Sequence, residues 1–252
     1  MLIKDQAICI RATDFSETSQ VVTFFARDHG KVAVLAKGAK RPRSPFGGPI
    51  ERFSHGGLVF ADSPHARLAT LTEFLPRCDL VRGLSGKISA YHAALLATEL
   101  LDGLTHDRDP HPVLHDRFLH FLQEVLAGPA VLGLLIRFQW VLLKEIGLQP
   151  VVDACVNCRT PYATTWPACS FSSSANGLVC RDCEGAFADR LCLTPRTAQT
   201  LAQIDCLTSA SPSVLQDMER LLLGHFTQIL HRRPKSAEIA LGTLFAAPRT
   251  GR

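Results

Sequence analysis

The sequence lacks any apolar run long enough to cross a membrane. A spanning helix needs roughly 20 consecutive apolar residues, and the longest candidates, such as residues 131–136, stop at a charge, here Arg137. The first six residues also carry no apolar signal segment. The sequence therefore predicts a cytoplasmic protein.

Signature motifs of common enzymes are missing as well. The sequence contains no G-x-S-x-G nucleophile elbow, no G-x₄-G-K-[ST] phosphate loop, no G-x-G-x-x-G turn and no H-E-x-x-H zinc helix. The serines at 172–174 lie in a loop of a cysteine-rich segment and do not form a nucleophile elbow. We therefore expect a protein that binds without catalysing a reaction.

Strong overall charge is absent, but positive charge is concentrated locally. The net charge of +4 on 252 residues decides nothing by itself. Between Lys31 and Arg43, however, five residues are basic and none is acidic. Such a cluster binds polyanions even in a nearly balanced chain. The alternative is a solvated loop whose charges merely aid solubility.

Four cysteines form the most informative pattern in the chain. Cys155 and Cys158 make one C-x₂-C pair, Cys180 and Cys183 make another, and 21 residues lie between the pairs. Two such turns bring four thiolates around one ion, which is the arrangement of structural zinc sites. Because four thiolates leave no coordination position for water or substrate, we expect one structural zinc ion that performs no chemistry.

Other interpretations of these cysteines are weaker. Two disulfides would need an oxidising compartment, and a redox C-x-x-C motif is a single pair near a βαβ unit. Cys169 lies between the two pairs and Cys192 follows them, and either could replace one of the four ligands. Cys169 has no partner at C-x₂-C spacing, which favours a bystander role.

The first 75 residues are typical of β structure. Short β-branched or aromatic runs occur at 6–10, 21–25, 32–35, 57–60 and 68–71. Five short strands without a long helix between them predict a small closed barrel or a sandwich. Residues 37–49, rich in glycine and proline, predict a long mobile loop. Phe46 and Phe53 are candidates for stacking on nucleic-acid bases, whereas strand alternation places one of Phe24 and Phe25 in the core.

The remainder of the chain is mainly helical. Apolar residues recur at helical spacing in 85–104, with Ser85 as the N-cap, and again in 113–126 and 130–146, while Thr194-Pro195 and Ser211-Pro212 are typical of helix starts. We therefore predict an α+β multidomain protein, with a small N-terminal β-barrel and an α-helical C-terminal domain that carries a four-cysteine zinc-binding segment. The predicted divisions are a barrel domain at 1–80, a helical domain at 81–150, the zinc segment at 151–186 and a C-terminal helical part at 187–252 that packs on the helical domain.

A histidine-rich stretch offers the main hint of catalysis. His106, His111, His115 and His120 lie close together in the sequence, near several aspartates. His111 and His115 are four residues apart and would share one helix face, as in some hydrolytic metal sites. No third ligand falls at a diagnostic spacing, so a polar loop and helix cap is the plainer interpretation.

The order of these parts resembles the bacterial RecO family of recombination mediators over nearly the full length. The matching segments are 32–41 with 44–46, Tyr91 with 98–101, 137–138 with 142–150, the two cysteine pairs with 171–172 and 177–179, and 232–236. Each segment is short, but their order and spacing together are specific. Two features depart from the family pattern: Arg159 stands where relatives often have glycine, and Cys169 is an extra cysteine.

The resemblance implies an OB-fold at the N-terminus that binds single- and double-stranded DNA and anneals complementary strands. It also implies that the protein acts with RecR to help RecA replace single-strand-binding protein on DNA. A surface of the helical domain is then expected to bind the C-terminal tail of single-strand-binding protein. These activities imply a role in the repair of DNA damage and a nucleoid-associated location in the cytoplasm.

The residues expected to contact DNA come mainly from the basic cluster. They are Arg11, Lys31, Lys37, Lys40, Arg41, Arg43 and Ser44, the last as an additional phosphate donor. Phosphate binding needs such donors and no rigid scaffold. The alternative is a zinc-ribbon regulator whose Arg159 and Arg181, beside the cysteine pairs, contact RNA or DNA directly.

Overall fold

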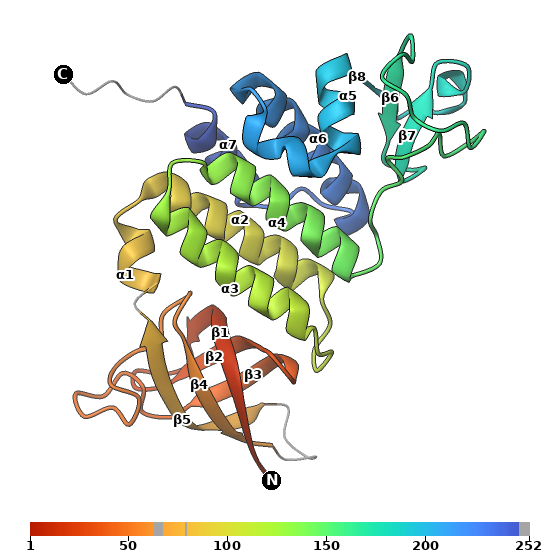
Figure 1. The fold of residues 1–252 in the computed structure, drawn as a ribbon. Helices are drawn as coiled ribbons and strands as arrows, with labels where there is room; N and C mark the ends of the chain where they lie inside the picture. The colour runs from red at the N-terminus through yellow and green to blue at the C-terminus, as the bar shows by residue number, and fades with distance from the viewer. Residues whose placement is uncertain (63–67, 79, 247–252) are drawn as a thin grey trace, which may run out of the picture. The chain divides into compact units, whose positions relative to one another are not determined.

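A computed structural model describes residues 1–62, 68–78 and 80–246 of the chain. Within these residues the chain forms two compact units. The first holds Met1–Tyr91 and Leu104–Ala127, and the second holds His92–Gly103 together with the described residues from Gly128 onward. Figure 1 labels the elements of both units. The four-part division drawn from the sequence stays a prediction.

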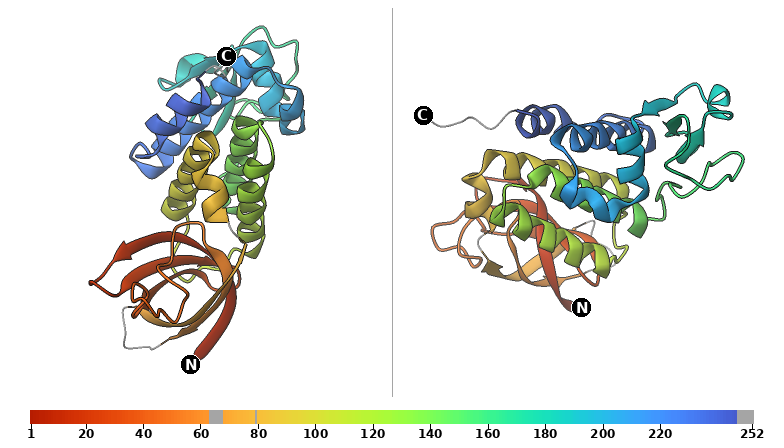
Figure 2. Two further views of the ribbon diagram at one scale, coloured as in Figure 1. Left: turned by 90° about the vertical axis from the view of Figure 1, so that its left-hand side faces the viewer. Right: turned by 45° about the horizontal axis from the view of Figure 1, so that its top comes forward.

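The first unit is built on a closed five-stranded barrel (Figures 1 and 2). Its strands are β1 (Leu2–Asp14), β2 (Gln20–Ala26), β3 (Gly30–Ala36), β4 (His55–Ala61) and β5 (Ala69–Cys78). They pair in the order β1-β2-β3-β5-β4, and β4 closes the barrel on β1. Neighbours are antiparallel except β3 and β5, which are parallel. A small barrel of this kind is the OB-type architecture, so the predicted barrel is confirmed.

Alternation along the strands fills this barrel with apolar side chains. On β2 and β3, the side chains of Val22, Phe24, Val32 and Val34 belong to the barrel core and are fully buried. The ring of Phe24 packs against that of Phe74 on β5, with centroids 5.1 Å apart. Because alternate residues point to opposite faces of a strand, the intervening residues lie on the outer surface of the barrel.

Of the pair Phe24 and Phe25, Phe24 belongs to the barrel core and Phe25 does not, as strand alternation predicted. Both Phe24 and Phe25 are fully buried, although neighbouring strand residues point to opposite faces. Phe25 faces outward but lies against His115 of helix α3 (Pro112–Ala127), with ring centroids 6.1 Å apart. Strand alternation could not predict this burial, because the covering helix is distant in the sequence.

Residues that follow the barrel cover one end of its outer surface. The short helix α1 (Leu80–Ser85) packs on α3. The loop before α3 reaches β3, where the Arg108 N–H donates to the Lys31 carbonyl at 3.0 Å. Gly30 lies directly under this loop, since a Cβ there would be 2.1 Å from the Asp109 carbonyl oxygen, and its φ of +65° also favours glycine. The close approach of the loop therefore depends on the glycine that starts β3.

Helix α2 (Ile88–Leu104) begins later than the sequence suggested. The expected N-cap residue, Ser85, is the last residue of α1, and its hydroxyl donates to the Arg82 carbonyl at 3.0 Å. Because α2 starts at Ile88, three residues after Ser85, Ser85 does not stand at the N-cap position of this helix. The expected cap at Ser85 is therefore wrong, while the helix itself is confirmed.

The second unit is mainly helical. Besides part of α2 it contains α4 (Val131–Glu145), α5 (Pro195–Ala202), α6 (Pro212–Leu230) and α7 (Ala237–Leu244), with 3₁₀ turns η1 (Glu184–Ala186) and η2 (Ile204–Ser209). Helices α4 and α6 pack side by side (Figures 1 and 2). As predicted, Thr194 and Ser211 cap α5 and α6 ahead of a proline. In the described part of the chain, no helix is long and apolar enough to cross a membrane.

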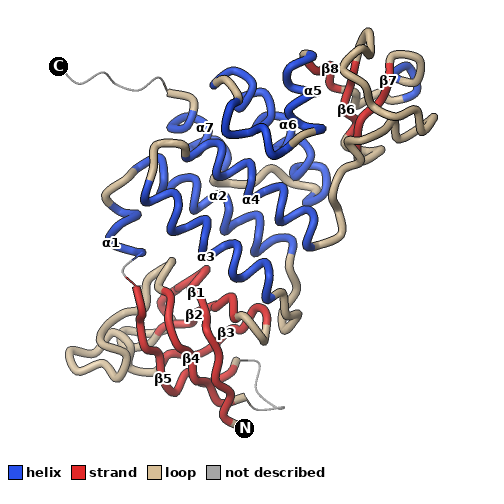
Figure 3. Tube along the Cα trace, in the orientation of Figure 1, coloured by secondary structure: helices blue, strands red, loops and turns tan. Residues whose placement is uncertain are grey.

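The cysteine segment carries a small antiparallel sheet of the second unit. Its strands are β6 (Cys169–Ser172), β7 (Gly177–Cys180) and β8 (Leu191–Leu193), which pair in the order β7-β6-β8. Figure 3 shows that loops make up most of the segment around these strands. The β6–β7 hairpin places Cys169 opposite Cys180. The hairpin thereby turns the chain back so that the second cysteine pair can approach the first.

Candidate nucleic-acid interface and metal centre

Part of the outer barrel surface is exposed or half-buried among the described residues, and we call it the open face. Outward-facing positions of β1, β2 and β3 align in two rows, Arg11–Thr23–Ala33 and Thr13–Val21–Leu35. Arg11 is exposed at one edge of this open face, and the residues of β2 and β3 in the rows are half-buried. OB-type barrels bind oligonucleotides on the face of strands 2 and 3 and on the β1–β2 loop. The open face is therefore the part of the barrel that fits a nucleic-acid strand.

Lys31 does not lie on this open face. Its side chain is only 9% exposed, beneath the loop before α3, and its Nζ lies 4.0 Å from an Asp107 carboxylate oxygen. Lys31 on β3 pairs with Phe25 on β2, and paired residues point to the same side of the sheet. Lys31 therefore points outward beside Phe25, toward the covered end of the face. A buried ammonium facing a carboxylate is not available to a phosphate. We therefore remove Lys31 from the expected DNA contacts.

The basic loop between β3 and β4 is hydrogen-bonded to the β1–β2 hairpin. The N–H of Gly38 donates to Ser19 Oγ at 3.2 Å, and the N–H of Lys40 donates to the Thr18 carbonyl at 3.0 Å. Near its end, the loop places Ile50 in the barrel core, where the side chain is 3% exposed. The hairpin and the basic loop thus form one continuous surface beside the open face.

Most cations of this loop face solvent. Lys37, Arg41 and Arg43 are exposed, and within the described residues no carboxylate lies at ion-pair distance from them. Lys40 is half-buried, and its Nζ lies 2.6 Å from Asp14 Oδ2. Asp14 therefore offsets one of the loop charges, while the other three are available to a polyanion.

Ser44 is occupied within the loop. Its hydroxyl oxygen accepts from the Phe46 N–H at 3.1 Å, and the hydroxyl donates to the Gly48 carbonyl at 3.4 Å. Ser44 would have to release Gly48 before it could donate to a phosphate. The structure thus gives Ser44 a local role in shaping the turn, and its contact with DNA stays a prediction.

The expected stacking residues Phe46 and Phe53 are both buried. Phe46 is 8% exposed and packs in the barrel core. Phe53 is 1% exposed, and its ring meets that of Tyr91 edge to face with centroids 5.9 Å apart. Neither ring offers a face to a nucleobase, so the stacking interpretation of these two residues is wrong. The sequence could not separate packing from stacking, because both use an aromatic next to a loop.

The four predicted zinc ligands come together in the second unit. The Sγ atoms of Cys155, Cys158, Cys180 and Cys183 all lie within 4.8 Å of one another. Cys155 is buried, Cys158 is exposed, and the other two are half-buried. The C-x₂-C turns and the β6–β7 hairpin position the sulfurs as the spacing predicted.

The geometry of the four sulfurs fits a tetrahedral metal ion. A Zn–S bond of about 2.3 Å places the sulfurs of a tetrahedron about 3.8 Å apart, and Cys158 Sγ lies 3.7 Å from Cys180 Sγ. The hydroxyl and N–H of Thr160 lower the pKa of Cys158 to about 6, whereas burial raises the pKa of Cys180 to about 12. A divalent cation would allow all four thiols to ionise, so the donor set fits zinc.

Nearby N–H groups support the sulfurs. The N–H of Cys180 donates to Cys155 Sγ at 3.5 Å, and Asn157 Nδ2 donates to Cys183 Sγ at 3.3 Å. Hydrogen bonds of this kind orient ligands and stabilise their charged form. Arg159, directly after the first pair, has a φ of +64° and donates its N–H to the Cys155 carbonyl at 3.0 Å. A left-handed turn of this kind is a conformation that glycine adopts at little cost.

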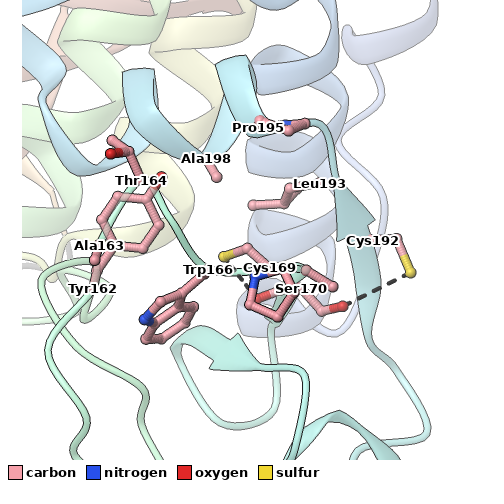
Figure 4. Close-up of a pocket in the computed structure, with 12 residues that line it drawn as sticks. Tyr162, Ala163, Thr164, Trp166, Cys169, Ser170, Cys192, Leu193, Pro195 and Ala198 are labelled. Carbon is pink, nitrogen blue, oxygen red and sulfur yellow. Dashed lines mark hydrogen bonds between the residues drawn. The ribbon is translucent and has the colours of Figure 1, made fainter.

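Cys169 and Cys192 lie outside the group of four sulfurs. Cys169 lines a pocket of about 160 Å³ together with Tyr162 and Trp166, whose rings meet edge to face with centroids 5.4 Å apart (Figure 4). Burial raises the pKa of the Cys169 thiol to about 12, so it stays neutral. Cys192 is exposed, and its Sγ accepts from the Ser170 hydroxyl at 3.7 Å (Figure 4). The structure thus favours Cys155, Cys158, Cys180 and Cys183 as the metal ligands, over Cys169 or Cys192.

The histidine-rich stretch does not assemble a metal site. His111 Nε2 lies 3.2 Å from Asp109 Oδ2, and the buried His115 has its Nδ1 3.1 Å from Asp116 Oδ1. In the ranges that the structure describes, the four cysteines are the one group of three or more side chains that could hold a metal. His111 and His115 instead lie beside neighbouring aspartates at the start of α3.

Comparisons with known proteins give a consistent result. Residues 1–76 match the family model "Recombination protein O N terminal", and residues 85–238 match "Recombination protein O C terminal". A "DNA repair protein RecO" of Bacillus pumilus (strain SAFR-032) is 30% identical over 201 residues, which cover 80% of this chain and 76% of the relative. Proteins of the same name from Bacillus subtilis (strain 168) and Anaeromyxobacter sp. (strain K) are 30% and 31% identical, covering 80% of this chain and 76% and 77% of theirs.

Proposed function

This chain belongs to the recombination protein O family, and from that premise we propose that it is a DNA-binding mediator of recombinational repair. The observation that carries the proposal is an open barrel face adjoined by a loop with three exposed cations. OB-type barrels commonly hold single strands on this face and its loops. We assign the phosphate contacts to Arg11, Lys37, Arg41 and Arg43. Lys40 contributes less, because Asp14 already neutralises it.

The mechanism that we propose is charge neutralisation without catalysis. Cationic side chains on the loop and the open face take the place of counterions around the phosphates of a bound strand. When two complementary strands bind near one another, their mutual repulsion falls, and annealing follows. No step in this mechanism needs a nucleophile or a general base, so the protein acts as a binding protein.

Partners follow from the resemblance to the family. Together with RecR, the DNA-bound protein helps RecA replace single-strand-binding protein, whose C-terminal tail binds the helical part of the chain. This activity would place the protein at the nucleoid in the cytoplasm. The support for these partners is the family membership.

One zinc ion, held by Cys155, Cys158, Cys180 and Cys183, would brace the second unit. Four sulfur ligands complete the coordination of zinc, so the ion would contribute folding stability and no reaction. The ion would then connect Cys180 and Cys183, at and after the end of β7, to Cys155 and Cys158, which lie before the small sheet.

Strand annealing in a salt series tests the proposed function. The substrate is complementary single-stranded DNA, bare or coated with single-strand-binding protein, and the variant replaces Lys37, Lys40, Arg41 and Arg43 with Ala. Each phosphate contact on a single strand contributes about 0.7 to the slope of log affinity against log salt. We expect the quadruple variant to lose most annealing activity and to flatten the slope by about 2 to 3.

A matched control separates this surface from total charge. Lys4, Arg77, Arg117 and Lys144 are exposed cations outside the basic loop, and replacing them with Ala removes the same number of charges. This control variant should keep the affinity and slope of the wild type. If the loop variant binds and anneals like the wild type, the loop is not the DNA-binding surface.

The alternative is that the cysteine segment, and not the barrel, contacts nucleic acid. Arg159 and Arg181 are both exposed beside the cysteine pairs, and the rings of Tyr162 and Trp166 lie in the same segment. Crosslinking to DNA and to RNA separates the two surfaces, since contacts should map to residues 11–44 for the barrel and to 155–185 for the zinc-ribbon alternative. Crosslinks confined to the cysteine segment would favour the alternative.

A further inference from the structure

We propose that Phe15 is a base-stacking site for single-stranded DNA at the edge of the basic loop, an inference that rests on the proposed function. Phe15 is 63% exposed, and among the described residues it is the one aromatic side chain in the set of exposed large hydrophobic residues. The aromatic residues first considered for stacking, Phe46 and Phe53, are buried. The exposed ring therefore lies in the β1–β2 hairpin.

The backbone of this hairpin is held in place. Phe15 follows the last residue of β1, and its N–H donates to the Ser19 carbonyl at 2.9 Å. The Ser16 N–H also donates to the Ser19 carbonyl, at 3.2 Å, and the Ser16 hydroxyl oxygen accepts from the N–H groups of Thr18 and Ser19. These bonds close the turn around Phe15. The fold therefore directs the ring into solvent instead of leaving it on a loose loop.

The residues that flank Phe15 connect it to the cations. Asp14 pairs with the Lys40 ammonium at 2.6 Å, the Thr18 carbonyl accepts from the Lys40 N–H at 3.0 Å, and Ser19 Oγ accepts from the Gly38 N–H at 3.2 Å. The hairpin and the basic loop are thus fastened together on both sides of the aromatic residue. A ligand that contacts the loop cations would pass the hairpin that carries the ring.

Charge decides which part of a strand lies over the ring. The hairpin carries the carboxylates of Asp14 and Glu17, which are both exposed and would repel a phosphate. The phosphates are instead attracted to Lys37 and its neighbours on the adjoining loop. A nucleobase is uncharged and has a flat π-face that stacks on an aromatic ring in any sequence. The arrangement therefore fits a base over Phe15 and the backbone along the loop.

A single exposed apolar side chain is common and by itself indicates nothing. What distinguishes Phe15 is its fixed hairpin, its links to the cationic loop, and its place in the β1–β2 loop that OB-type barrels use for oligonucleotides. In a duplex the bases are already stacked on one another and cannot cover the ring. Phe15 should therefore favour single-stranded over double-stranded DNA.

The test measures affinities of the full-length protein for three probes of equal length: a thymidine oligonucleotide, the same sugar–phosphate chain without bases, and a duplex. Base–aromatic stacking by one residue corresponds to a loss of about 5- to 150-fold when it is removed. We expect Phe15→Ala to lose affinity in that range for the thymidine probe only, with an unchanged salt slope. Phe15→Trp should retain the affinity of the wild type. Its tryptophan fluorescence should be quenched when DNA binds, and by more than that of the wild type, which has only the two native tryptophans. Leu75→Ala, at a residue 59% exposed on β5, is the control.

Each outcome is decisive. If Phe15→Ala binds the thymidine probe like the wild type while the quadruple loop variant does not, stacking is wrong and the proposed DNA-binding surface stands. If both variants bind like the wild type, the surface itself is wrong. An equal loss for all three probes would mean that Phe15 only shapes the loop, which also overturns stacking. Should Phe15→Ala fold poorly, Phe15→Leu serves in its place, and quenching in Phe15→Trp decides independently.

Discussion

The carboxylate of Glu99 accepts two hydrogen bonds from Ser236, from its N–H at 2.9 Å and from its hydroxyl at 2.7 Å. Arg232 and the N–H of Lys235 bind the other oxygen of Glu99 at 2.9 Å and 2.8 Å. Two segments that are distant in the sequence, 98–101 and 232–236, thus meet at one carboxylate. This contact fastens the chain after α6 to α2 within the second unit.

The Glu99 contact predicts a loss of stability in acid. Burial alone would raise the pKa of Glu99, but the N–H groups of Ser236 and Lys235, the Ser236 hydroxyl and Arg232 lower it to about 2 from 4.5. Because the folded-state pKa is depressed, the stabilisation is complete above about pH 4.5 and is lost as the pH falls toward 2. Glu99→Gln should cost about 1.5–3 kcal/mol at pH 7, and the difference from wild type should shrink in acid. Urea unfolding at pH 7, 4.5 and 3 measures it. A difference independent of pH would contradict the assignment.

The cysteine cluster predicts that metal content and folding depend on four residues. Cys158→Ser or Cys180→Ser should lower both zinc content and the yield of folded protein, since structural zinc contributes about 10–16 kcal/mol in small zinc domains. Cys192→Ser is the matched control, because Cys192 is exposed and lies outside the group of four sulfurs. Elemental analysis of freshly purified protein measures the zinc. Wild-type protein without zinc would reject the metal site.

The left-handed turn at Arg159 predicts a stabilising substitution. A non-glycine residue at a φ of +64° carries strain of about 1 kcal/mol that glycine avoids. Arg159→Gly should therefore raise the free energy of unfolding by about that amount. Arg181→Gly in the second C-x₂-C turn is the control, since Arg181 does not have a positive φ and glycine there should be neutral or destabilising. Thermal unfolding of zinc-loaded protein compares the two. Equal effects of both substitutions would show that φ at Arg159 is not the cause.

The features that could be predicted from the sequence are those that depend on short spacing. The cysteine pairs converge as expected because two local turns and one hairpin suffice to gather the sulfurs. The caps at Thr194 and Ser211 are hydrogen bonds within a few residues, and the barrel strands follow from their β-branched runs. Each of these features carries its cause within a short stretch of chain.

The features that could not be predicted depend on segments that are distant in the sequence. Phe25 and Lys31 are buried because α3 and its preceding loop return to cover β2 and β3. Phe46 is buried because its loop folds back into the barrel core. Phe15 did leave a local signal, an aromatic residue in an otherwise polar turn between two strands. That signal gains meaning only when the hydrogen bonds to the basic loop are known.

Lys31 and Lys37 make the sharpest test of the corrected interface, because both belong to the basic cluster and only Lys37 is exposed. Lys37→Ala should weaken binding to single-stranded DNA and reduce the salt slope by about 0.7. Lys31→Ala should leave affinity and slope unchanged but lower the free energy of unfolding by about 0.5–2 kcal/mol, since its buried stem packs beneath the loop that carries Asp107. Fluorescence anisotropy at several salt concentrations and urea unfolding measure the two effects. A salt slope reduced equally by both substitutions would show that Lys31 does reach a phosphate and would return it to the interface.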